Sequence, residues 1–247
     1  MNNYKKAERI IKSTEELSNL PVRVVWDDQL QVGAVVHLSE IDLTKQIRIS
    51  VKPGRTDTDY LVGLQCAMAM NFVRHKDETK HLVSCDGSIE KGIKEFIHLG
   101  YPDNISTQIA NQIIPSVGQQ LRGMAPQLVL STWIHKSFPE LRDSQLSHHL
   151  QEVNTSYSSL EIDSKQYPKW ILESHQAMNG AFALATDYLF DRNDQFTPFK
   201  NSGYEGICTH LIESVTASSK EDSGYILVSK WIELLELTEK FCWTNNG

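Results

Sequence analysis

Residues 57–74 read DTDYLVGLQCAMAMNFVR and predict the strongest helix in the chain. Its apolar residues recur at helical spacing and form a wide stripe made of Tyr60, Leu61, Leu64, Met68, Phe72 and Val73. Thr56 or Thr58 can cap its amino end, where Asp57 and Asp59 suit the positive pole of the helix dipole. A helix of this length extends over about 27 Å. We expect it to be the buried central helix of the fold.

Three short segments before this helix predict strands, at residues 21–26, 32–38 and 46–51. In the third segment Ile47, Ile49 and Val51 alternate with polar residues, which is typical of a strand with one buried face. A first helix is predicted over residues 3–18. These elements together predict a small, mainly antiparallel sheet in the amino-terminal part.

The remainder of the chain reads as helix. The predicted segments are 88–99, 105–114, 117–124, 128–138, 141–157, 168–190, 206–218 and 225–241. Pro115, Pro126 and Pro139 are expected to end helices, and the polar stretch 154–167 is the best internal linker. The fold class is therefore expected to be α+β, with an α+β domain at residues 1–100 and a mostly α-helical domain at 101–247.

The composition of the chain argues against a disordered protein, a broad nucleic-acid-binding protein and a protein with a membrane helix. The chain has 247 residues, 40% of them hydrophobic, and a net charge of −7. Residues 1–100 hold 14 basic and 14 acidic side chains, whereas residues 101–247 hold 10 and 17. The apolar content argues against a disordered chain, and an acidic helical part argues against broad nucleic-acid binding. No segment approaches the roughly 18 apolar residues of a membrane helix.

The cellular setting is expected to be the cytoplasm. The amino-terminal residues are polar and do not resemble a signal peptide. The four cysteines, Cys66, Cys85, Cys208 and Cys242, form no Cys-x-x-Cys pair, so we interpret them as reduced thiols. Cys66 is expected to be a small core residue.

The order of one helix, three strands and a long buried helix resembles the minimal gluzincin fold of IrrE-like metallopeptidase domains, over residues 3–75. In that family the long helix holds the zinc motif HExxH inside a run similar to residues 60–74. In the best register Leu64 replaces the first histidine, Gln65 the glutamate and Met68 the second histidine. The resemblance covers less than a third of the chain and depends on element order and helix pattern.

These replacements remove the hydrolytic chemistry that the resemblance implies. Two histidines at positions i and i+4 hold zinc, and the glutamate serves as general base toward the bound water. Leu64 has no ligand atom, Met68 offers a thioether that suits copper(I) better than zinc, and Gln65 lacks a basic carboxylate. We expect no catalytic residues, no catalytic zinc and no cofactor. An ordinary core helix without peptidase ancestry explains the same residues.

The resemblance implies a non-catalytic binding or regulatory protein, a pseudoenzyme on an inactive metallopeptidase-like scaffold. A degenerate cleft with Leu64, Gln65 and Met68 on its floor would bind a protein or peptide partner. The family's setting implies a bacterial system of antiviral defence, stress response or toxin–antitoxin type. Two alternatives stay open: a structural subunit of a larger complex that uses its helices as the interface, and an enzyme of an unrecognised class.

Other candidate sites have weaker patterns. His75, His81 and Cys85 offer two imidazoles and a thiolate, but their spacing matches no defined zinc site, and a solvated loop is the simpler interpretation. His149 and Glu152 stand at i, i+3, which we interpret as a polar contact on a helix surface. The aromatic carboxyl end, Phe241-Cys242-Trp243, is either core or an exposed anchor for a partner or for a homo-oligomer formed through the carboxyl-terminal helices.

Overall fold

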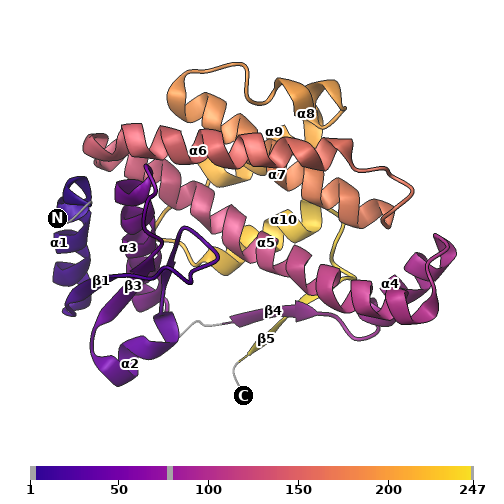
Figure 1. Ribbon diagram of the computed structural model, residues 1–247, viewed down its shortest axis with the longest axis horizontal. Coiled ribbons are helices and arrows are strands. Elements are labelled where there is room, and N and C mark those ends of the chain that lie inside the picture. Colours follow the sequence, from indigo (N-terminus) through magenta and orange to yellow (C-terminus); the bar gives the residue numbers. More distant parts are fainter. Residues whose placement is uncertain (1–3, 77–79, 246–247) are drawn as a thin grey trace. The chain divides into compact units, whose positions relative to one another are not determined.

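The computed structural model describes residues 4–76 and 80–245 (Figure 1). The chain forms two compact units, which we call unit 1 (residues 1–77 and 129–152) and unit 2 (residues 78–128 and 153–247). This division differs from the expected boundary at residue 100. The reason is that Leu130, Ile134, Phe138 and Leu141 join the apolar core built by the amino-terminal sheet and its helices.

Unit 1 contains the predicted α+β arrangement. Its elements are η1 (Lys5–Ala7), α1 (Glu8–Ser18), β1 (Val22–Trp26), β2 (Ala34–Val36), η2 (Leu38–Glu40), α2 (Ile41–Thr44), β3 (Ile47–Val51), α3 (Thr58–Arg74), residues 129–137 of α5 (Asp103–Ser137), η4 (Pro139–Leu141) and residues 142–152 of α6 (Arg142–Ser156). The strand order is β1-β3-β2, with β1 parallel and β2 antiparallel to β3.

The central helix of unit 1 is α3, as the sequence predicted. It packs beside α1 and against β2 and β3. Ile47, Ile49 and Val51 of β3 have no exposed surface, which confirms the predicted apolar face, and Ser50 on the other face is buried as well. Gly63 allows a close approach within this core, because a Cβ there would lie 2.9 Å from Leu141 Cδ1. The amino-terminal cap differs from the prediction: Asp57 occupies the N-cap position, in place of Thr56 or Thr58.

Unit 2 is mostly helical. Its elements are β4 (Lys80–Ser84), α4 (Ser88–His98), residues 103–128 of α5, residues 153–156 of α6, η5 (Tyr157–Glu161), α7 (Lys169–Phe190), α8 (Thr197–Asn201), α9 (Glu205–Thr216), α10 (Gly224–Leu234) and β5 (Phe241–Asn245). The α+β fold class is therefore confirmed: two of the three strand pairs, β2–β3 and β4–β5, are antiparallel, and helices dominate.

Two expectations for the helices were wrong. Pro115 and Pro126 lie inside α5, which Figure 1 shows as one continuous ribbon, so they do not end three separate helices. A proline inside a helix removes one hydrogen bond, and here tertiary packing outweighs that cost. The last helix ends at Leu234 and does not reach Phe241, because Glu236 adopts a left-handed conformation with φ of 56°.

Residues Phe241–Asn245 form a strand, β5, which the sequence did not predict. β5 pairs antiparallel with β4, a strand in the region we had interpreted as a solvated loop (Figure 1). Phe241 is buried, Cys242 is exposed, and the indole of Trp243 donates a hydrogen bond to Ser229 Oγ at 2.8 Å. Phe241 and Trp243 thus belong to the packing of unit 2.

Candidate functional site

Leu64, Gln65 and Met68, the positions that we aligned with a zinc motif, belong to the apolar core of unit 1 or pack against it. Leu64 is 3% exposed and Gln65 is 8% exposed, and Met68 packs against the same core while partly buried. The region between Leu64 and Met68 is therefore filled by side chains of unit 1. An open cleft with these three residues on its floor, which was one expectation, does not fit this packing.

Gln65 has a structural partner. Its Oε1 accepts a hydrogen bond from the backbone N–H of Val36 in β2, at 2.9 Å. In and beside β2, the backbone N–H and C=O groups of the odd-numbered residues point toward β3. This follows because Lys52 N donates to Gly33 O and His37 N donates to Arg48 O. The N–H of Val36 consequently points away from β3, at the outer edge of the sheet. Gln65 thus occupies a backbone donor that a strand-like peptide would use.

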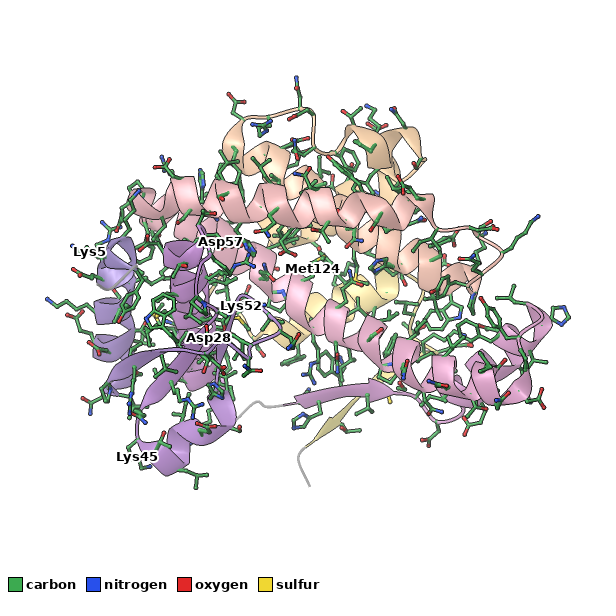
Figure 2. All side chains as sticks on the ribbon, viewed as in Figure 1. Lys5, Asp28, Lys45, Lys52, Asp57 and Met124 are labelled. Carbon is green, nitrogen blue, oxygen red and sulfur yellow. The ribbon has the colours of Figure 1, made fainter. Side chains whose placement is uncertain are left out.

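A cluster of hydrogen-bonded polar side chains, Arg55, Asp57 and His148, lies at the start of α3, where Figure 2 labels Asp57. Asp57 Oδ2 accepts hydrogen bonds from Arg55 Nη2 at 2.6 Å and from His148 Nδ1 of α6 at 2.9 Å. Arg55 Nε also donates to Asp57 Oδ1 at 2.8 Å, so the guanidinium binds in a bidentate manner. The Asp57 side chain is 1% exposed and that of His148 is 8% exposed. The network links the loop before α3 to α6 within unit 1.

Burial and hydrogen bonding together determine the pKa values of Asp57 and Arg55. Burial alone would raise the pKa of Asp57, but the hydrogen bonds from His148 and Arg55 outweigh it and hold that pKa well below its usual range. The hydrogen bond to Asp57 raises the pKa of Arg55. Asp57 therefore stays ionised at neutral pH, fully paired with its neighbours.

Deeper in unit 1 the polar groups form neutral contacts. The Tyr60 hydroxyl lies 2.5 Å from Ser131 Oγ and 3.5 Å from His149 Nε2. Gln145 donates from Nε2 to the Ser131 carbonyl at 2.9 Å. Burial lowers the pKa of His149 far below its ordinary value and raises that of Tyr60. Both side chains are therefore neutral at pH 7.

These buried histidines correct the sequence interpretation. His149 has no exposed surface, so it does not form the predicted contact on a helix surface, and its neighbour His148 is buried too. The adjacent pair in α6 was visible in the sequence, but the acceptor of His148 is Asp57, which lies 91 positions away. An Asp–His pair can hold an imidazole for proton transfer, and here both members lie in the interior of unit 1, where the pair links the start of α3 to α6.

The weak metal candidates do not assemble into a site. His75 is the C-cap of α3 in unit 1, while His81 belongs to β4 and Cys85 follows that strand in unit 2. Four positions along an extended chain separate His81 from Cys85 by about 13 Å. Among the residues that the structure describes, no group of three or more potential metal ligands occurs.

The buried cysteines are structural. Cys66 and Cys208 have no exposed surface. Burial raises the pKa of both thiols to about 12, so they stay protonated and unreactive at neutral pH.

Comparisons of the chain with protein-family models, with curated proteins and with solved structures found no match. Across residues 4–76 and 80–245, no helix has the length and apolar character that a membrane crossing requires.

Proposed function

We propose that the chain is a non-catalytic binding or regulatory protein whose unit 1 is an inactive, metallopeptidase-like scaffold. The observation that supports this most directly is the hydrogen bond from Val36 N to Gln65 Oε1. In the family that the sequence resembles, the corresponding glutamate faces a catalytic water. Here the amide at that position links the central helix to the edge strand of the sheet.

The neighbouring positions fit the same role. Leu64 is buried in the apolar core and Met68 packs on it, so both contribute to stability through burial of apolar surface. A protein or peptide partner would therefore contact the outer surface and not the positions of the lost motif. The proposed cytoplasmic location is the one expected from the cysteines, which we interpret as reduced thiols. The proposed role in a bacterial defence, stress or toxin–antitoxin system is taken from the resemblance alone.

A hydrolysis assay tests the non-catalytic part of the proposal. The full-length protein is incubated with a mixture of fluorogenic peptides and added zinc, next to the variant Gln65→Ala. We expect no cleavage above the protein-free blank for either protein, because position 65 has no general base in the wild type. Zinc-dependent cleavage by the wild type that the Gln65→Ala variant lacks would show that the site is catalytic.

A further inference from the structure

Unit 2 contains a pocket of about 350 Å³ on the side of α7 that faces α5. The helix α5 contributes Ile113, Val117 and Gln120 to its wall, and α7 contributes Ile171, Leu172 and His175. This size lies within the range of about 300–1,000 Å³ that is typical of small-molecule sites. Its apolar residues come from both helices, so a ligand would bury most of its surface there.

Two polar side chains that line this pocket, Gln120 and His175, form a closed ring of hydrogen bonds with Asn179. His175 Nδ1 donates to Gln120 Oε1 at 2.8 Å, since an amide oxygen can only accept. Gln120 Nε2 donates to Asn179 Oδ1 at 3.1 Å, and Asn179 Nδ2 donates to His175 Nε2 at 3.2 Å. Each member thus fixes the orientation of the next, and the imidazole is held in its neutral Nδ1–H form. Burial also lowers the pKa of His175.

The ring leaves specific hydrogen-bond capacity for a ligand. Gln120 uses one of its two amide hydrogens on Asn179, and the other can donate to a bound acceptor. The phenol of Tyr167, which lines the same pocket, offers a second donor and an aromatic ring. The lining residues that the structure describes have uncharged side chains, so an ionised ligand would lose its hydration without a counter-charge.

We propose that this pocket binds a small, neutral, flat aromatic molecule that presents one hydrogen-bond acceptor, such as a ring carbonyl, to Gln120. Its ring lies between the aliphatic side chains of α5 and α7. The proposal concerns unit 2 alone and does not depend on the peptidase-like interpretation of unit 1.

Chromone, a neutral bicyclic ketone, is the probe that tests this proposal. Its partner probe is chroman, which keeps the bicyclic ether but lacks the carbonyl. Binding to the full-length protein is followed by chemical-shift changes of backbone amides. The variant Ser116→Trp places a large ring at the exposed rim of the pocket, and Ile105→Trp makes a comparable change elsewhere on α5, at a side chain that is 37% exposed.

We expect chromone to shift amide signals in residues 113–120 and 171–175 and to bind at least about threefold more tightly than chroman. Ser116→Trp should weaken chromone binding by about tenfold or more, and Ile105→Trp by less than about twofold. Equal affinities for chromone and chroman would overturn the proposed acceptor contact with Gln120. Absence of saturable chromone binding, or equal weakening by both tryptophan variants, would overturn the pocket itself as the site.

Discussion

At the scale of single residues, Gln65 links the central helix α3 to the edge strand β2. A glutamine has the length of a glutamate but no basic oxygen, and here its oxygen accepts the Val36 N–H of an edge strand. An edge strand normally leaves such donors open to another chain. Gln65 therefore removes one backbone donor through which β2 would pair with a peptide.

Replacing Gln65 by leucine should destabilise unit 1 by about 1–3 kcal/mol, because the buried N–H of Val36 would lose its acceptor. Urea unfolding measures the loss, and hydrogen exchange at the Val36 amide reports the contact directly. Met68→Leu is the matched control, since a volume-conserving change at an apolar position costs less than about 1.5 kcal/mol. Unchanged exchange at Val36 in the Gln65→Leu variant would contradict the contact.

Asp57 provides a second prediction for a single residue. Asp57→Asn should cost about 3 kcal/mol at pH 7, because it removes the charge that Arg55 and His148 face in the interior. The pKa of Asp57 is lowered in the folded state, so its contribution is present above the unfolded pKa of about 3.9 and declines as the pH falls below it.

The control for Asp57→Asn is the variant Asp143→Asn. In the wild type the Asp143 side chain is 93% exposed and its carboxylate pairs with Lys6. This control should change the unfolding free energy by less than about 0.5 kcal/mol. An Asp57→Asn variant as stable as the Asp143→Asn variant at pH 7 would show that the buried network contributes nothing.

At the scale of elements, the sequence predicted those helices and strands whose formation depends on residues close together in the chain. The strands and the helix of residues 57–74 were predictable because their apolar periodicities of 2 and 3.6 were clear. The β4–β5 pair was missed, since it joins segments about 160 positions apart and β4 has only one buried residue, Leu82. Pro115 and Pro126 misled the interpretation of α5, because long-range packing can retain a helix across a proline.

Phe241 tests whether β5 is part of the core of unit 2 or an exposed anchor. Its ring packs so closely on α5 that a Cβ at Gly118 would lie 2.9 Å from Phe241 Cε1. Phe241→Ala should therefore destabilise the protein by about 3–5 kcal/mol in urea unfolding, whereas the exposed Cys242→Ala should have little effect. A stable Phe241→Ala variant with a changed oligomeric state would instead support the anchor.

At the scale of the whole molecule, the two compact units differ in net charge. Unit 1 holds 13 basic and 13 acidic residues, and unit 2 holds 11 and 18, so unit 2 accounts for the whole net charge of −7. The sequence indicated this asymmetry but placed the boundary at residue 100. Residues 129–152 were assigned to the helical part because their contribution to the core of unit 1 is visible only in the fold.

One buried and two half-buried histidines predict how stability depends on pH. Burial lowers the pKa of His149, His135 and His175 in the folded state. The unfolded chain then binds more protons below its histidine pKa of about 6.5, so the free energy of unfolding should fall as the pH decreases from about 7.5 toward 5. Urea unfolding at a series of pH values measures this slope.

The variant His149→Gln should reduce the slope, because it removes the histidine with no exposed surface. His210→Gln, at an exposed position of α9, should leave the slope as it is. A pH-independent unfolding free energy between about 5 and 7.5 would contradict the neutral state of these imidazoles.

The central claim is our proposal that Leu64, Gln65 and Met68 are core positions of a scaffold without a zinc site. Native mass spectrometry of the purified protein, after incubation with zinc and removal of the excess, tests it most directly. Because Leu64 has no ligand atom and Gln65 already binds Val36, the account predicts no zinc that depends on residue 65. One zinc ion per chain that is retained by the wild type and lost in the Gln65→Ala variant would contradict it.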